Sequence, residues 1–410
     1  MTPPLRILTI APLPPTVTGG IEEYAYSVVD ALRSSGADVT VLTTSDVPFS
    51  AGTGPTVLVP AIDLLSRPVC VDPMAYVRTI PLLRRADAVH VHMPFPGFEL
   101  FAAFVAKVLG KPVVVTYHMD VVVDVPERGG PRHLLHRLVE RVYSKLSAAL
   151  TLDLATVVCT NTRAYALQSP LLRPRLEKVS IVHQGIDAQK LAFLSPARAA
   201  ELRQEYLGDR YDRLVSFVGR FVPYKGLDYL VEAIARLGDE RTLFVLGGRG
   251  PLVEHVAALV RARGLTNVRL IGFVPDQDLV NLFRASDVVV SPSISVLEST
   301  PITLLYALAV GTPVVGSEIG GTGESVPSDG VHGVIVPIED PAAIATALRR
   351  LFGVPRAHDE EARPRLWSDV AADYAGLFHQ LSHLPVVRSP AAAGSPAGGA
   401  LGSPITIRQK

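Results

Sequence analysis

Short runs of apolar residues alternate along this chain with longer segments whose apolar positions recur at helical spacing. The first run, at 6–11, is followed by a turn containing Thr18, Gly19 and Gly20, and 21–34 then has the spacing of an amphipathic helix. Short apolar strands separated by helices predict an α/β fold with doubly wound parallel sheets. The predicted strands are 6–11, 38–43, 88–92, 113–117, 156–160 and 178–182, then 214–218, 242–246, 268–271, 288–291, 312–315 and 334–336.

This pattern runs through the chain twice and so predicts two domains. We expect a first Rossmann-like domain at 1–190 and a second at 191–365, with the polar stretch 187–212 as the linker. A last helix, at about 368–381, is expected to pack back on the first domain, and the Ala-, Gly-, Ser- and Pro-rich end, 386–410, is expected to be disordered. Ligands of open α/β sheets bind beyond the carboxyl ends of the strands, so we expect the site in a cleft between the domains. The other predicted helices are 101–109, 134–150, 227–237, 251–263, 276–285, 303–309 and 341–352.

The composition is that of a globular chain with a large interior, because 48% of its 410 residues are hydrophobic and 19% are charged. Lys and Arg together number 39, as do Asp and Glu, so no strong overall field would attract nucleic acid or an anionic membrane. No uncharged apolar run is long enough to span a bilayer, and the N-terminus leads straight into a strand rather than a secretory signal. Only Cys70 and Cys159 are present, so no disulfide framework is expected and a reducing cytoplasm fits.

Two cations follow the first predicted strand of the second domain. Arg220 and Lys225 lie in a turn flanked by Gly219 and Gly226. A guanidinium forks onto one phosphate and an ammonium gives a point charge to another, so this pair suits a diphosphate. Without their context, two solvated loop cations would be the simpler interpretation; the flanking glycines favour the functional one.

A carboxylate stands close before a predicted helix about 70 residues further on. Glu298 precedes Ser299, Thr300 and Pro301, where that helix opens. Glu298 has two compatible interpretations: an acceptor for the hydroxyls of a sugar, or an acid favoured by the helix dipole by about 0.3–1 kcal/mol. Hydroxyls and backbone N–H groups of the next residues would face the same ligand.

Two glycine-rich turns connect strands to helices, at Gly19-Gly20 and at 247–250. Missing side chains let a phosphate or a sugar approach the backbone, but a tight turn accounts for the glycines equally well. Neither turn has the third glycine of the dinucleotide fingerprint, which disfavours a nicotinamide-dependent oxidoreductase.

Histidines occur near the ends of two strands in the first domain. His90 and His92 alternate along one strand, and His118 and Asp120 follow the next. Three histidines suggest zinc, but the ligand spacing of such sites is missing, so no metal is expected. We expect His90 to be half-buried packing, and the other three to rim the cleft, where His118 would hydrogen-bond a sugar or titrate near neutral pH.

One predicted helix carries basic residues on one side, namely Arg132, Arg137, Arg141 and Lys145. Such a helix can touch an anionic membrane. A solvated helix face is favoured instead, because Glu140 interrupts the row and the chain is neutral.

Taken in order, several segments resemble landmarks of the GT-B glycosyltransferases of the retaining family-4 type. The resemblance extends from about residue 6 to residue 381. It rests on G-G-I-E-E-Y from Gly19, T-Y-H-M-D around His118, V-H-Q-G-I-D at 182–187, V-G-R-F-V-P-Y-K-G-L-D from Val218, V-L-G-G-R-G-P-L from Val245, L-I-G-F-V-P from Leu270, A-S-D-V-V-V-S-P-S from Ala285 and A-L-A-V-G-T-P-V-V from Ala307.

The resemblance implies a GT-B fold, that is, two Rossmann-like domains facing a cleft, with a nucleoside-diphosphate sugar as co-substrate and no metal or other cofactor. It implies that Arg220 and Lys225 hold the diphosphate, that Glu298 holds hydroxyls of the donor sugar, and that His118 faces the reacting sugar. Transfer of a hexose with retention of anomeric configuration is the implied reaction. The remaining donor-binding residues that it implies or that lie beside these are Gly19, Gly20, Phe273, Ser299, Thr300, Pro301, Ile302 and Tyr306.

One departure from the family pattern concerns the ribose. The family usually has a second glutamate eight positions after the first, whereas this chain has Tyr306 there, and it has Gln184 where Asn is frequent. Losing a charge-assisted hydrogen bond costs about 1.5–3 kcal/mol. The chain then tolerates weaker binding, or is a non-catalytic nucleotide-sugar-binding partner subunit, or uses a donor without a 2′-hydroxyl such as a dTDP-sugar. The acceptor and the donor hexose are not readable from the sequence.

Overall fold

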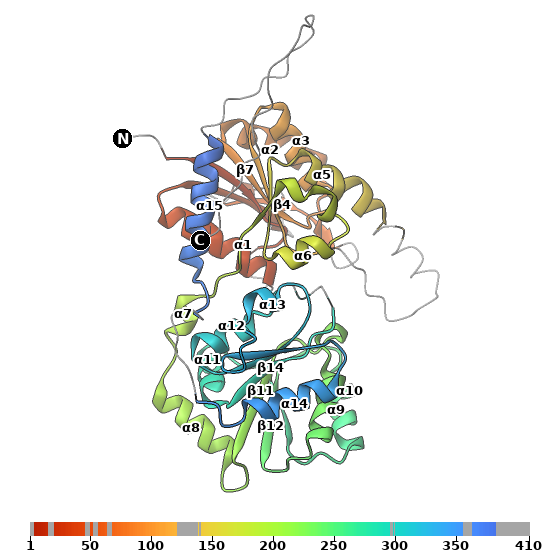
Figure 1. Ribbon diagram of the computed structural model, residues 1–410. Helices are drawn as coiled ribbons and strands as arrows, with labels where there is room; N and C mark the ends of the chain where they lie inside the picture. The colour runs from red at the N-terminus through yellow and green to blue at the C-terminus, as the bar shows by residue number, and fades with distance from the viewer. Residues whose placement is uncertain are drawn as a thin grey trace, which may run out of the picture.

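The computed structural model describes residues 4–14, 20–45, 50–51, 56–63, 68–120, 138, 141–295, 298, 300–355 and 363–382. Two α/β halves lie one above the other (Figure 1), and this confirms the predicted fold class. Gly19, Ser299 and the predicted disordered end at 386–410 lie outside the described residues.

The first half is built on a sheet with the strand order β10-β9-β8-β7-β1-β2-β4-β3, in which every neighbouring pair is parallel except β3 with β4. The first half also contains a separate antiparallel pair of strands, β5 and β6. Its elements are β1 (Arg6–Ile10), α1 (Gly20–Ser34), β2 (Asp38–Ser45), β3 (Ser50–Ala51), β4 (Thr56–Pro60), β5 (Ile62–Asp63), β6 (Pro68–Val69), α2 (Pro73–Arg85), β7 (Ala88–Met93), α3 (Phe98–Val108), β8 (Val113–Tyr117), the π-helical segment η1 (Tyr143–Ala148), α5 (Ala149–Leu154), β9 (Val157–Thr160), α6 (Arg163–Gln168), η2 (Arg173–Lys178) and β10 (Val179–Ile181).

The second half has a wholly parallel sheet with the order β13-β12-β11-β14-β15-β16. Its elements are α7 (Ala188–Leu191), α8 (Pro196–Leu207), β11 (Arg213–Val218), η3 (Pro223–Lys225), α9 (Leu227–Leu237), β12 (Thr242–Gly247), α10 (Val253–Ala262), β13 (Val268–Gly272), α11 (Asp276–Ala285), β14 (Val288–Ser291), α12 (Ile302–Ala309), β15 (Val314–Ser317), α13 (Thr322–Ser325), β16 (Gly333–Val336) and α14 (Pro341–Leu351). The last helix, α15 (Trp367–Ser382), returns to the first half.

Helices cover both faces of the first sheet, which explains why its central strands are apolar throughout. One face packs against α2, α3, η1 and α5, through small inward residues such as Ala75, Ala102 and Ala106. The other face packs against α1 and α15, through Tyr24, Trp367, Tyr374 and their neighbours. The chain end therefore completes the core of the half that begins the chain.

The expected linker at 187–212 is only partly a linker. Ser195 caps α8 by accepting a hydrogen bond from the backbone N–H of Arg198, and Pro196 occupies the first turn, where its missing N–H costs nothing. α8 then buries Ala199 and Leu202 and packs against α11. Because α8 has few apolar residues, the sequence pattern did not predict this helix, which belongs to the second half.

The chain passes between the halves twice, and the two crossings lie side by side. Ile186 and Leu366 form a parallel bridge, with the N–H of Ile186 donating to the carbonyl of Arg365 at 2.9 Å and the N–H of Trp367 donating to Ile186 at 3.2 Å. A Cβ at Gly185 would lie 2.8 Å from the carbonyl carbon of Leu366, so this close approach requires glycine.

Candidate active site

The predicted cations and the predicted carboxylate lie where the connections of the second sheet change direction. β11 and β14 are neighbours, but β11 leads to β12 on one side and β14 leads to β15 on the other. The two loops that leave these strands therefore begin side by side at the carboxyl edge, the usual ligand position of such sheets.

The backbone of these two loops is tied together. The N–H of Ile294 donates to the carbonyl of Tyr224 at 2.8 Å. Gly226 has φ +64°, and a Cβ there would lie 2.1 Å from the carbonyl oxygen of Pro292. Only glycine fits this position, and its fit brings Lys225 up against the second loop.

Lys225 and Glu298 join these two loops as an ion pair, Nζ to Oε2. Ser293 adds a hydroxyl that donates to the same carboxylate oxygen at 3.0 Å. Both charged side chains are only 11% exposed. The structure thus brings together the two residues that the sequence assigned to the diphosphate and to the sugar.

Arg220 belongs to the same loop but is exposed. Within the described part of the chain its guanidinium has no ion-pair partner. Burial raises the pKa of the Tyr224 phenol, and the charges of Lys225, Glu298 and Arg220 all act on it. The Lys225 ammonium lies 5.5 Å from the centre of the Tyr224 ring.

The glycine turn at 247–250 packs against this loop. Gly219 N–H donates to Gly247 at 3.0 Å, and a Cβ at Gly248 would lie 1.8 Å from the Gly219 carbonyl oxygen. The glycines here are required by the contact between two loops. This structural requirement accounts for them without a phosphate or sugar bound at the turn. The turn supports the backbone that carries Arg220.

The remaining donor-side positions lie along the same edge. Phe273 is 58% exposed, with the guanidinium of Arg249 at 5.0 Å from its ring centre. Pro301 precedes the first residue of α12, Ile302, and Thr300 beside it is buried. An exposed aromatic ring at the end of β13 is a surface on which a base can stack.

Tyr306 points away from solvent and toward the connection between the halves. It is 1% exposed, and its hydroxyl accepts a hydrogen bond from the N–H of Asp187 at 3.0 Å. The ammonium of Lys190 lies 6.0 Å from its ring centre. The phenol therefore anchors the start of α7, and burial raises its pKa, so it stays neutral.

The histidines form a buried row at the carboxyl edge of the first sheet. A hydrogen bond of 3.0 Å joins His92 Nδ1 to His118 Nε2, and another of 2.8 Å joins His90 Nε2 to Thr116 Oγ1. His90 and His92 are 0% exposed, so the expected half-buried and rim positions are wrong. Tyr374 of α15 covers His90 and shares a hydrogen bond of 2.7 Å with Thr116, whereas Tyr24 of α1 and His118 pack against His92.

Burial lowers the pKa of His90 and of His118 to about 3, so these rings are neutral at physiological pH. The expectation that His118 titrates near neutral pH is therefore wrong, although its ring still offers a neutral hydrogen-bonding nitrogen. Asp120 does not rim a cleft freely, because Tyr117, Tyr165 and Ser169 all donate to its carboxylate at 2.9 Å. Among the described residues, no histidine, cysteine or acidic side chains group as metal ligands.

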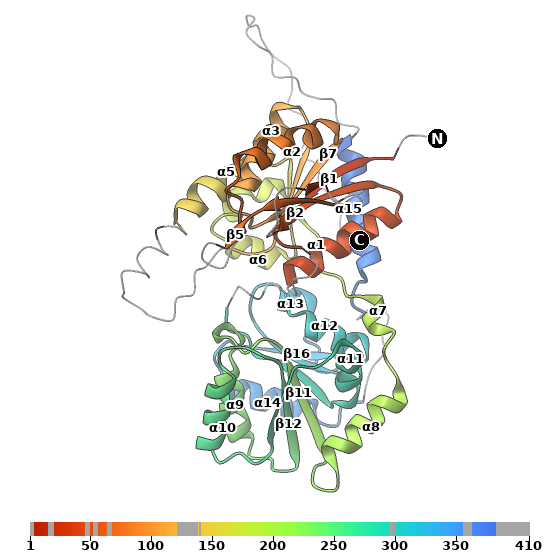
Figure 2. The ribbon, with the colours of Figure 1, turned by 180° about the vertical axis from the view of Figure 1, so that it is seen from behind.

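A carboxylate that the sequence analysis missed joins the two halves. Glu324 in α13 accepts hydrogen bonds from the N–H groups of Arg163 and Ala164, at 2.9 and 2.5 Å, and so caps α6 across the junction. Figures 1 and 2 both show α1 and α6 facing α13 there. Gly20 opens α1, with open space around the position of a Cβ. The carboxyl edges of the two sheets thus face each other.

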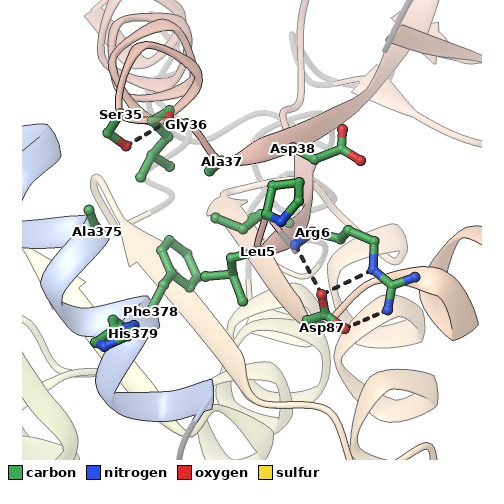
Figure 3. Close-up of a pocket in the computed structure, with 13 residues that line it drawn as sticks. Leu5, Arg6, Ser35, Gly36, Ala37, Asp38, Asp87, Ala375, Phe378 and His379 are labelled. Carbon is green, nitrogen blue, oxygen red and sulfur yellow. Dashed lines mark hydrogen bonds and ion pairs between the residues drawn. The ribbon is translucent and has the colours of Figure 1, made fainter. Parts of the chain in front are cut away.

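Two pockets of the structure lie in different places. One of about 350 Å³ lies at this junction and includes His183, Gln184 and Glu324. The other, of about 770 Å³, lies at the amino ends of β1 and β2, where Phe378 and Leu5 form an apolar wall and Arg6 pairs with Asp87 (Figure 3). The second pocket is at the opposite edge of the sheet from the candidate site.

Comparison with known proteins agrees with this geometry. Residues 18–190 match the Glycosyltransferase Family 4 description, and residues 199–363 match Glycosyl transferases group 1. D-rhamnosyltransferase WbpZ of Pseudomonas aeruginosa is 30% identical over 367 residues, which span 88% of each protein. The chain belongs to the family-4 type of GT-B glycosyltransferases.

Two further proteins resemble this glycosyltransferase at lower identity than WbpZ. O-antigen chain mannosyltransferase C of Escherichia coli is 28% identical over 294 residues, covering 70% of this chain and 72% of that protein. Sucrose-phosphate synthase from Thermosynechococcus elongatus has a similar structure, with a TM-score of 0.66, 20% identity and coverage of 92% of this chain and 99% of its own. At that identity the structural likeness supports the GT-B fold alone. No described helix is long and apolar enough to cross a bilayer.

Proposed function

We propose that this glycosyltransferase moves a hexose-type sugar from a nucleoside-diphosphate sugar to an acceptor and retains the anomeric configuration. The observation that carries the proposal is the Lys225–Glu298 pair at the carboxyl ends of the neighbouring strands β11 and β14. The relatives named for rhamnosyl and mannosyl transfer support a hexose-type donor. A structure of the Anabaena protein Alr3699/HepE, with 18% identity and a TM-score of 0.64, contains UDP and supports the nucleotide-sugar class.

In this proposal the donor separates the ion pair. The diphosphate takes Lys225 together with the exposed Arg220, and the hydroxyls of the sugar take Glu298, which Ser293 holds in place. Positive charge at the leaving group stabilises the developing phosphate charge, and the carboxylate fixes the orientation of the sugar. The departing phosphate oxygen takes the proton of the acceptor on the same face, so no protein nucleophile is required.

His118 would act on the sugar as a neutral group. Its Nε2 is engaged by His92, so Nδ1 is the ring nitrogen available to a ligand. Because burial keeps the pKa at about 3, His118 would contribute a hydrogen bond rather than general acid catalysis.

The position of Tyr306 bears on which nucleotide the donor carries. With the phenol turned to Asp187, no second carboxylate follows Glu298 at the predicted ribose position. We propose that the donor lacks a 2′-hydroxyl, as a dTDP-sugar does, because such a donor loses the least binding free energy when this carboxylate is missing. Calorimetric titration with dTDP and with UDP tests this: tighter dTDP binding is expected, and a clear preference for UDP would reject it.

Release of nucleoside diphosphate from a panel of donor sugars, followed by mass spectrometry, tests the activity itself. We expect release from at least one donor by the native chain and none by Lys225→Ala. A binding titration without any release would favour the alternative of a non-catalytic partner subunit. The absence of a metal requirement and a cytoplasmic location stay predictions, which chelator treatment and cell fractionation can check.

A further inference from the structure

The two histidines of β7 each use only one ring nitrogen for a hydrogen bond. His90 Nε2 lies 2.8 Å from Thr116 Oγ1, and His92 Nδ1 lies 3.0 Å from His118 Nε2. Both rings are 0% exposed, and their other nitrogens, His90 Nδ1 and His92 Nε2, have no hydrogen-bond partner in the part of the chain that the structure describes. The two rings therefore leave opposite nitrogens without a partner.

This difference indicates where the proton of each ring is held. A neutral imidazole has one protonated nitrogen, which donates, and one bare nitrogen, which accepts. A buried N–H group without a partner is rare in proteins, and a buried acceptor without one is less so. We therefore expect His90 to carry its proton at Nε2 and to donate to Thr116, whereas His92 carries its proton at Nδ1 and donates to His118.

The tautomer of His92 determines that of His118. If Nε2 of His118 accepts the hydrogen bond from His92, it is the bare nitrogen, and the proton of the ring is at Nδ1. Burial lowers the pKa of His118 to about 3, so the ring does not carry a second proton near neutral pH. Nδ1, the nitrogen that His92 leaves available, is then a hydrogen-bond donor only.

Neighbouring groups hold the His118 ring in this orientation. Its plane is within 15° of that of His92, with ring centres 5.3 Å apart, and the ring of Tyr24 packs edge-on at 4.9 Å. The hydroxyl of Tyr24 shares a hydrogen bond of 3.1 Å with Tyr374, which ties α1 to α15. The backbone N–H of His118 donates to the carbonyl of Met93 at 3.4 Å. The direction of Nδ1 is thus fixed by packing as well as by His92.

We propose that His92 is a positioning residue that fixes His118 as the Nδ1–H tautomer, so that His118 donates a hydrogen bond to an oxygen of the reacting sugar. This inference rests on the proposed function, in which His118 faces that sugar. A group that only donates selects an oxygen with a free lone pair. A donor sugar with a deoxy carbon or an ammonium group at this position would leave the N–H unpaired and would bind more weakly.

Long-range ¹⁵N–¹H NMR of the full chain labelled with [¹⁵N]histidine tests the tautomers directly, because protonated and bare ring nitrogens have different ¹⁵N shifts. At pH 7.5 we expect protons at Nδ1 of His118, at Nδ1 of His92 and at Nε2 of His90. Signals are assigned by their loss in single variants, with His118→Asn and His118→Gln as two independent choices for His118. A proton at Nε2 of His118 would overturn the proposal.

Two substitutions of His92 separate positioning from packing. The amide nitrogen of Asn can take the place of Nδ1, and that of Gln can take the place of Nε2. His92→Asn should therefore keep the proton of His118 at Nδ1 and most of kcat/KM. His92→Gln should give mixed His118 tautomers and lower kcat/KM by about five- to ten-fold, the value of one hydrogen bond.

His90→Gln is the matched control within the same buried row, because it keeps a donor toward Thr116 and His90 does not hydrogen-bond His118. It should change neither the His118 tautomer nor kcat/KM, and thermal melting shows that each variant folds. Equal losses of activity in His92→Asn and His92→Gln would overturn the positioning role. A native chain that releases no nucleoside diphosphate from any donor would count against the proposed function, whereas the NMR result does not depend on turnover.

Discussion

The two sheets are built alike, but their facing carboxyl edges carry different chemistry. At the second sheet, Lys225 and Glu298 form an ion pair held by Ser293. At the first sheet, His92 and His118 form a hydrogen bond between neutral rings. The same parallel construction therefore offers charge on one side of the junction and uncharged hydrogen-bonding groups on the other. In the proposed reaction the former would stabilise a leaving diphosphate, and the latter is compatible with an acceptor hydroxyl that reacts beside it.

The strongest test of this comparison removes the charged side. Lys225→Met and Glu298→Gln should each lower kcat/KM by about 100- to 1,000-fold, as expected when one group that stabilises transition-state charge is lost. Each should also lower the free energy of unfolding by about 3–5 kcal/mol, because the partner is left buried and unpaired. Urea titration of both variants measures the second effect separately from the first.

The double variant Lys225→Met/Glu298→Gln serves as the control. It removes both charges, so its stability should be closer to that of the native chain than either single variant, while its activity stays as low as theirs. A double variant with restored activity would show that the pair has a structural role only.

The second prediction concerns the neutral side. The pKa of His90 and of His118 is lowered from about 6.5 when unfolded to about 3 when folded. The unfolded chain therefore binds protons that the native chain refuses, and stability falls as the pH drops from about 6.5 toward 3. At pH 5 each ring should cost about 2 kcal/mol. Unfolding in urea at pH 7.5 and 5.0 measures this loss.

His118→Gln removes one of these rings and should reduce the pH-dependent loss by about 2 kcal/mol. His255→Gln is the matched control, because His255 is exposed at 52% beside Asp228 and does not belong to the buried row. The same pH dependence in His118→Gln as in the native chain would contradict the burial of a neutral ring.

The third prediction asks whether Tyr306 has a structural role between the two halves. Tyr306→Phe leaves the N–H of Asp187 without its partner, which should cost about 1–3 kcal/mol of stability. Tyr211→Phe is the control within one half, since its hydroxyl donates to Thr266 at a longer distance of 3.3 Å. Nucleotide affinity measured in both variants separates anchoring from donor binding: unchanged affinity in Tyr306→Phe is expected if the phenol only anchors α7.

The smallest expected effect concerns the contact between the facing edges. Glu324→Gln loses one charge that caps α6 across the junction and should cost about 0.3–1 kcal/mol, screened by salt. Glu254→Gln, in the first turn of α10 within the second half, controls for a general helix effect. A shift in KM for the donor in Glu324→Gln alone would show that this contact affects closure of the halves.

The sequence predicted the elements whose pattern is strong. The strand expected at 113–117 and the helix expected at 276–285 have the same bounds as β8 and α11. α2 was missed, because Pro73 and Pro81 interrupt its pattern, although the first suits a helix start. The spacing of apolar residues indicates which side of a segment is buried. It does not indicate whether a helix tolerates the prolines within that segment.

The site was predicted only in part. Lys225 and Glu298 were expected in one crevice, yet their direct pairing depends on β11 lying beside β14, an order that no local pattern encodes. The burial of His90 depends on α15, which returns from the far end of the chain. The capping of α6 by Glu324 depends on how the halves meet. Each of these is a long-range property of the fold.

The paired crossings at Ile186 and Leu366 have a mechanical consequence. A single connecting strand lets two bodies swivel in every direction, whereas two strands joined by backbone hydrogen bonds act as a flat strap that bends easily but resists torsion. The two halves would then open and close by rotation about a single hinge axis. Each closure would return Lys225 and His118 to the same relative position. Cutting the chain at either crossing would leave the two halves connected by the other crossing but free to twist relative to each other.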